Sequence, residues 1–157
     1  MLQSLINITC YFIFIHLTLL SAQADDMIDN ISLNGKWAII FDQDNRGGFE
    51  KWHLKHLFEN QKEVSDIQVP SHWETMKKDY EGVVFYKKSF WVPKSWNVGV
   101  FSLHFEAVNY KTEVWVNDQA VGTHEGGFTP FSFQIDEVLK PGEINHIIMR
   151  VVGPILM

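Results

Sequence analysis

Apolar and polar residues alternate with a period of two along much of this chain. The pattern is clearest from Phe101 to Ala107, where Phe, Leu, Phe and Ala alternate with Ser, His and Glu. Such alternation is typical of a half-buried β-strand. The other segments that we expect to form strands are residues 36–41, 83–92, 112–116, 131–135 and 147–151. The pattern therefore predicts a chain made mostly of short strands.

Turn-forming residues separate these segments. Asn117-Asp118 predicts a tight hairpin turn, because both residue types tolerate positive φ. Residues 49–60 fit either a short helix or a loop, and residues 136–139 predict one helical turn before Pro141-Gly142. No other segment after residue 24 has a sustained helical period, so a β-sandwich or jelly roll is favoured over a βαβ fold.

The apolar positions of the strands predict one sandwich core. Its expected members are Phe101, Leu103, Phe105, Val114, Val116, Phe131, Phe133, Ile135, Ile147 and Met149. Trp37 is expected to join them from the first strand. If Phe105 is fully buried there, its replacement by alanine is expected to cost about 3–5 kcal/mol of stability.

The first 24 residues differ from the rest because they contain no Asp, Glu, Lys or Arg. An apolar run from Leu5 to Leu20 leads to Ala22 and Ala24, a small-x-small pattern that signal peptidase accepts. We predict a signal peptide over residues 1–24, cleavage after Ala24, and a secreted or periplasmic product. An uncleaved anchor is the alternative. Cys10 is the only cysteine, so the mature chain would hold no disulfide and no cysteine-ligated zinc.

Composition narrows the function classes. Residues of the AVILMFWYC set make up 46% of the chain, which supports a real core and argues against disorder. The net charge of −6, without a basic run, argues against nucleic acid as a partner. No His-x-His or His-Glu-x-x-His pattern occurs, so the sequence predicts no zinc site and no cofactor.

Several motifs occur in a specific order. They include Leu-Asn-Gly-x-Trp at 33–37, Val-Pro-Ser-His-Trp at 69–73 and a longer run at 80–93. The most specific stretch runs from 105 to 131 and contains Val-Trp-Val-Asn-Asp and His-Glu-Gly-Gly-Phe. The order and spacing resemble the N-terminal sugar-binding domain of glycoside hydrolase family two, which includes β-galactosidases and β-glucuronidases. The resemblance covers roughly residues 31–152, within a domain predicted at 25–157.

The resemblance implies a jelly-roll β-sandwich of the galactose-binding-domain-like type. In that family an immunoglobulin-like domain and a TIM barrel follow, and the two catalytic glutamates lie on the barrel. No part of this sequence corresponds to the barrel, and the family's jelly roll continues past residue 157. The resemblance therefore implies a non-catalytic fragment that lacks its last strand or strands and whose partner is the missing barrel.

Carboxylates of the chain itself offer an alternative source of chemistry. Glycoside hydrolysis uses two carboxylates about 5–10 Å apart, and adjacent strands and loops carry Glu106, Glu113, Asp118 and Glu125. Almost any sandwich offers such pairs, so we interpret them as surface or turn groups. No catalytic residue is predicted.

Five residues are candidates for contact with carbohydrate. His124 and Glu125 lie beside two glycines, where polar groups can reach sugar hydroxyls, although they can equally brace the turn. Trp73, Tyr80 and Tyr86 flank a loop that faces the barrel in the family, and their rings suit stacking on sugar, although such residues more often serve packing.

Two functions from different classes remain open. The first is an accessory carbohydrate-binding domain of an exported family-two β-glycosidase. The second is a free-standing lectin-like module without chemistry, and a non-functional truncation is a third interpretation. After signal cleavage, no membrane partner is expected.

Overall fold

The computed structural model describes residues 30–154, so the predicted signal peptide and Cys10 lie outside the described residues. The secondary-structure elements all belong to one compact unit that begins at Ser32. No helix among residues 30–154 is long and apolar enough to cross a membrane.

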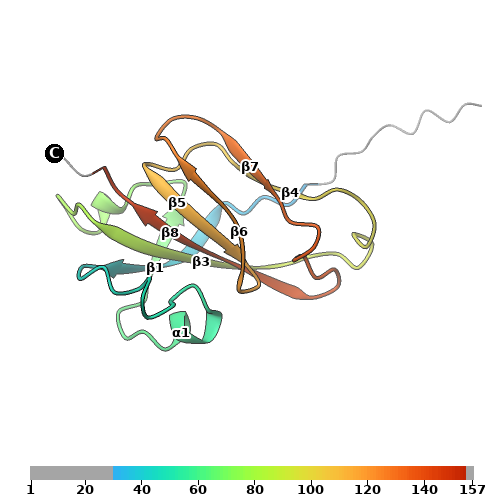
Figure 1. The fold of residues 1–157 in the computed structure, drawn as a ribbon, viewed down its shortest axis with the longest axis horizontal. Helices are drawn as coiled ribbons and strands as arrows, with labels where there is room; N and C mark the ends of the chain where they lie inside the picture. The colour runs from blue at the N-terminus through green and yellow to red at the C-terminus, as the bar shows by residue number, and fades with distance from the viewer. Residues whose placement is uncertain (1–29, 155–157) are drawn as a thin grey trace, which may run out of the picture. The chain divides into compact units, whose positions relative to one another are not determined.

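Eight strands form two antiparallel sheets (Figure 1). The large sheet has the strand order β2-β1-β3-β8-β5-β6, and the small sheet pairs β4 with β7. The strands are β1 (Gly35–Asp42), β2 (Ser65–Val69), β3 (Val83–Trp91), β4 (Ser102–Phe105), β5 (Lys111–Val116), β6 (Gln119–Glu125), β7 (Phe131–Gln134) and β8 (Ile144–Val152). The prediction of an all-β sandwich is therefore confirmed.

Helical structure is short. The helix α1 spans Lys55–Glu59 and the 3₁₀ turn η1 spans Trp73–Thr75. Within the segment 49–60, only Lys55–Glu59 is helical, and residues 43–54 form turns. The predicted turn at Asn117-Asp118 is present, with φ of 50° and 68°, and it joins β5 to β6.

The main core lies between the two sheets. Its buried members include Trp37, Leu103, Val114, Val116, Ile135, Ile147 and Met149, and Phe101, Phe105 and Phe133 pack against it while partly exposed. Phe131 is the exception to the predicted core. It is half-buried and stacks between His124, with ring centroids 4.0 Å apart, and Phe105, at 4.8 Å. The Phe131 ring therefore packs in an aromatic stack beside the small sheet and not in the main core.

A second apolar cluster covers the opposite face of the large sheet. Ile40, Phe85 and Ile148 pack there against Trp52 and Phe58 from the segment that contains α1. The middle of the large sheet is thus covered on both faces, and Figure 1 shows α1 on one side of the sheet and β4 and β7 on the other. This explains the continuous apolar runs Val83–Phe85 in β3 and Ile147–Met149 in β8, since all six side chains are buried.

Close packing of this second cluster requires a glycine. A Cβ atom at Gly47 would lie 2.5 Å from Phe85 and 2.6 Å from Trp52. The buried carboxylate of Asp42 holds the turn by accepting hydrogen bonds from the backbone N–H groups of Arg46 and Gly47, each at 2.8 Å. The turn therefore places Trp52 over the sheet.

Candidate functional site

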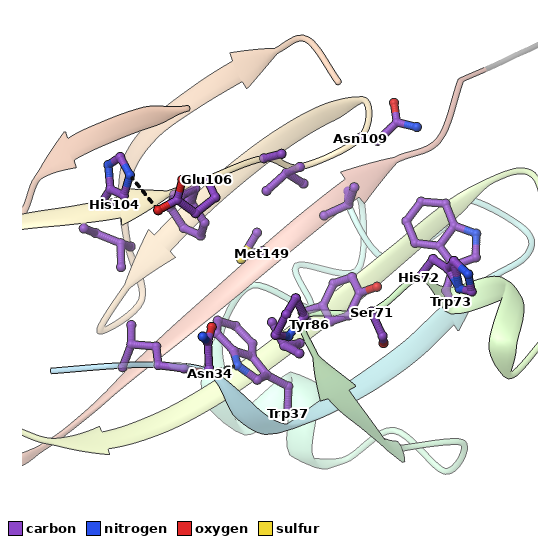
Figure 2. A pocket seen from close by; sticks show the side chains of 18 of the residues that line it. Asn34, Trp37, Ser71, His72, Trp73, Tyr86, His104, Glu106, Asn109 and Met149 are labelled. Carbon is purple, nitrogen blue, oxygen red and sulfur yellow. Dashed lines mark hydrogen bonds and ion pairs between the residues drawn. The ribbon is translucent and has the colours of Figure 1, made fainter. Parts of the chain in front are cut away.

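A groove with a volume of about 410 Å³ opens between the two sheets (Figure 2). The large sheet contributes Trp37 from β1, Tyr86 from β3 and Met149 from β8, and the small sheet contributes Leu103 and Phe105 from β4. Among the described residues, the large sheet has six strands and the small sheet that lies across from it has two. The small sheet therefore leaves part of the apolar inner face of the large sheet uncovered, and this uncovered part is the groove.

Aromatic rings form much of the groove wall, and hydrogen bonds fix two of them. The indole N–H of Trp37 donates to the carbonyl oxygen of Leu33 at 2.7 Å. That of Trp73, on η1, donates to the carbonyl oxygen of Tyr80 at 3.1 Å. Both rings are buried at about 5–7% exposure, so they present fixed apolar surfaces to the groove.

Tyr86 adds a polar group to this wall. Burial, and to a lesser degree the negative charge of Glu74, raise the pKa of the Tyr86 hydroxyl well above its usual value. The hydroxyl therefore stays protonated at neutral pH and remains able both to donate and to accept a hydrogen bond.

Polar side chains line the rest of the groove and have the hydrogen-bonding capacity that a ligand with hydroxyl groups needs. They are Asn34, Ser71, His72, Glu74 and Asn109, and His104 and Glu106 also border the groove, with side chains on the strand face opposite Leu103 and Phe105. The ring of His104 is held at both nitrogens. Its Nδ1 lies 2.9 Å from Ser132 Oγ and its Nε2 lies 3.6 Å from Glu106 Oε1, the ion pair drawn in Figure 2. No lysine or arginine lines the groove. Apolar rings beside such groups suit a neutral polyhydroxyl ligand.

The five residues proposed from the sequence separate into two groups. Trp73 and Tyr86 line the groove. Tyr80, His124 and Glu125 are not among the lining residues. The hydroxyl of Tyr80 instead donates to the carbonyl oxygen of Val83 at 2.8 Å, and burial raises the pKa of this hydroxyl.

His124 and Glu125 lie at the end of β6, where each has a partner within the domain. His124 stacks on Phe131, and its Nε2 lies 3.3 Å from Thr129 Oγ1. The carboxylate of Glu125 lies 3.7 Å from Lys111 Nζ on β5. The sequence allowed two roles for these residues, bracing the turn or contacting sugar. The observed contacts fit the bracing role, and contact with sugar stays a prediction.

The sequence did not identify several residues that line the groove. Trp37 was expected in the core, and Asn34, His104 and Asn109 were not singled out. Alternation along 101–107 places Leu103 and Phe105 on one face and His104 and Glu106 on the other. No local pattern indicates that β4 lies across from Trp37 and Met149, because that contact joins segments far apart in the sequence.

The four carboxylates considered for chemistry are scattered. Glu113 pairs with Arg150 at 3.1 Å, and Glu125 pairs with Lys111. Glu106 has a side chain that is 92% exposed. Of the four, only Glu106 lines the groove.

Asp118 is the remaining member of this set. Its Oδ1 lies 2.9 Å from His146 Nε2 and accepts a hydrogen bond from the backbone N–H of Lys55 at 2.8 Å. Burial opposes ionisation, but these two hydrogen bonds together with the charges of His146 and His56 outweigh it and hold the pKa of Asp118 below its usual value. A general acid at neutral pH needs the opposite shift.

Comparison with known proteins gives consistent matches. A family model described as "Glycosyl hydrolases family 2, sugar binding domain" matches residues 75–154. A β-glucuronidase of Paenibacillus borealis is 34% identical over 124 residues, which are 76% of this chain and 20% of the relative. A β-galactosidase of Thermoanaerobacter pseudethanolicus is 34% identical over 116 residues, which are 74% of this chain and 14% of the relative.

Solved structures agree with these matches. A Ruminococcus gnavus β-glucuronidase superimposes with a TM-score of 0.71 at 26% identity, covering 78% of this chain and 21% of that structure's chain. The chain thus spans about a fifth or less of the length of these relatives.

Proposed function

The chain belongs to the sugar-binding domain family of the family 2 glycosyl hydrolases, and from this premise we propose that it is the accessory carbohydrate-binding domain of an exported β-glycosidase. Its role is to bind carbohydrate and to pack on a catalytic barrel, and it carries out no chemistry itself. The relatives are β-glucuronidases and β-galactosidases, so the proposed substrates of the whole enzyme are β-linked glycosides.

The observation that carries this proposal is the family match over residues 75–154. The groove supports it independently, because Trp37, Trp73 and Tyr86 line it beside polar residues. The C–H face of a sugar ring is apolar and its hydroxyls need hydrogen-bond partners, so this combination suits a sugar. The groove is open on one side, and we expect weak binding because a small ligand would be only partly buried there.

The absence of catalysis is supported by the carboxyl groups. Retaining and inverting glycosidases both need a carboxylic acid that is protonated near neutral pH. Among residues 30–154, the carboxyl groups whose pKa values are shifted are Glu59 and Asp118, and both are lowered. Glu74 and Glu106, which line the groove, are both exposed. These features favour binding over hydrolysis.

Titration calorimetry with methyl β-glucuronide and methyl β-galactoside tests the proposal. Tyr86→Phe removes the hydroxyl in the groove, and we expect it to weaken binding by roughly threefold to tenfold, which corresponds to one hydrogen bond. The matched control is Tyr80→Phe. It removes a hydroxyl bonded to Val83 outside the groove lining, so it should lower stability and leave sugar affinity unchanged.

Equal effects of the two variants on sugar affinity would contradict a site in this groove. No heat with either glycoside, from a chain whose near-ultraviolet circular dichroism shows ordered aromatic side chains, would contradict the binding role itself.

A further inference from the structure

A tripeptide just before the first strand matches the acceptor pattern for N-linked glycans. Asn30-Ile31-Ser32 places a hydroxyl residue two positions after an asparagine, with no proline between them. Of the asparagines after residue 24, Asn30 alone has serine or threonine at this position. A second such tripeptide, Asn7-Ile8-Thr9, lies within the predicted signal peptide and would be removed with it. The mature chain would therefore carry one acceptor.

The structure leaves this acceptor open to solvent. Asn30 and Ser32 are both exposed, and residues 30–34 belong to no helix or strand. The strand β1 begins only at Gly35, so the tripeptide lies before the sheet in the chain. A transferase has to bind an acceptor tripeptide in its own active site, and an exposed segment without regular structure permits this.

The hydroxyl group of Ser32 is also available. Its oxygen accepts a hydrogen bond from the backbone N–H of Asn34 at 3.4 Å, which is longer than the usual range. This bond does not use the hydroxyl hydrogen, so Ser32 can still donate to an enzyme. Asn117 and Asn145 are in the opposite situation. Both are buried and hydrogen-bonded to each other, which leaves no room for a glycan.

We propose that Asn30 accepts an N-linked glycan when the chain is exported through a compartment that contains an oligosaccharyltransferase and its lipid-linked oligosaccharide. The side-chain Nδ2 of Asn30 loses a proton and bonds to the anomeric carbon of the first sugar. The bond between that carbon and the pyrophosphate oxygen breaks, and the lipid pyrophosphate leaves with the electron pair. The inference rests on the proposed export, and it adds a modification site that carbohydrate binding does not require.

Secretion of the 157-residue chain from a yeast culture tests the proposal. Peptide mass spectrometry, with and without peptide N-glycosidase, should show a glycan at Asn30 on most secreted chains, and the glycosidase should leave aspartate at this position. Asn30→Gln removes the acceptor and Ser32→Ala removes the hydroxyl, so each should abolish the glycan. Ser32→Thr keeps a hydroxyl and should keep the glycan. All three positions changed are exposed and precede β1, so the variants should fold.

A positive control uses an asparagine elsewhere on the surface. Lys62→Thr, combined with Asn30→Gln, places a hydroxyl residue two positions after Asn60, and both sites are exposed. A glycan at Asn60 in this variant shows that the transferase of the host reaches the chain. Secreted chain without a glycan at Asn30, from the same host, overturns the proposal. So does a glycan at Asn30 that persists in Ser32→Ala.

A second version of the chain separates modification from export. In it, a signal peptide of the host replaces residues 1–24. A glycan at Asn30 in this version, together with retention of the original chain inside the cell, would contradict the proposed export and support Asn30 as an acceptor. Secretion of both versions without a glycan at Asn30 would support export and overturn the acceptor site.

Discussion

Leu103 and Phe105 show how two inward positions on one strand differ in their contribution to stability. Leu103 is buried at 5% exposure, whereas Phe105 is only partly buried because it borders the groove. Leu103→Ala should lower the free energy of unfolding by about 2–5 kcal/mol. Phe105→Ala should cost less than the 3–5 kcal/mol expected of a fully buried phenylalanine, since part of its ring already meets solvent.

Urea unfolding followed by tryptophan fluorescence measures both values. A loss for Phe105→Ala above 5 kcal/mol would contradict the partial exposure of this ring.

At the scale of elements, a charge-assisted contact joins α1 to the β5–β6 turn. Asp118 in the turn accepts a hydrogen bond from the backbone of Lys55, the first residue of α1, and contacts His146 on β8. The pKa of Asp118 is lower in the folded chain than in the unfolded chain. Its stabilising effect is therefore complete above the unfolded pKa, near pH 4, and is lost as pH falls through the folded pKa.

Asp118→Asn tests this element contact. The variant should be less stable than the wild type at pH 7, and the difference in free energy of unfolding should shrink between pH 4 and pH 2. Urea titrations at these pH values measure it, with Asp79→Asn at an exposed loop position as the control. A difference that is constant with pH would mean that the ionised carboxylate of Asp118 does not stabilise the fold.

Edge strands were the elements that the alternating pattern missed. β2 buries only Ile67, and β6 has no buried residue. Both lie at the ends of the large sheet. Strands in these positions are fixed mainly by backbone hydrogen bonds to β1 and β5. Backbone pairing does not require alternating apolar and polar side chains, so the sequence pattern does not reveal it.

For the whole molecule, the main prediction concerns catalysis. The chain should not hydrolyse aryl β-glucuronides or aryl β-galactosides, because Glu74 and Glu106, the carboxylates that line the groove, are both exposed, whereas a general acid needs surroundings that keep it protonated near neutral pH. A fluorogenic assay, with the Paenibacillus borealis β-glucuronidase as a positive control, measures it. Turnover that persists through purification and disappears in Glu125→Gln or Glu106→Gln would make the domain catalytic.

Export is the second prediction at this scale. The uncharged apolar segment that ends at Ala24 predicts cleavage there and a mature chain beginning at Asp25. N-terminal sequencing of protein recovered from the periplasm or medium should read Asp-Asp-Met. An intact Met1 in the recovered soluble protein would contradict cleavage.

The sequence by itself determined the all-β class, the central strands, the turn at Asn117-Asp118 and most of the core. These features depend on local alternation, turn chemistry and burial, which neighbouring residues encode directly. The motif order from 33 to 131 also indicated the family. Of the residues that line the groove, the sequence provided only Trp73 and Tyr86 as candidates.

The tertiary structure alone decided which residues meet. Trp37, Tyr86, Leu103 and Met149 come together because β1, β3 and β8 are neighbours in one sheet and β4 lies across from them. The covering of the middle of the large sheet on both faces and the place of Phe131 outside the main core have the same origin. They depend on contacts between residues distant in sequence, and a periodic pattern within one strand contains no information about which strand will lie opposite.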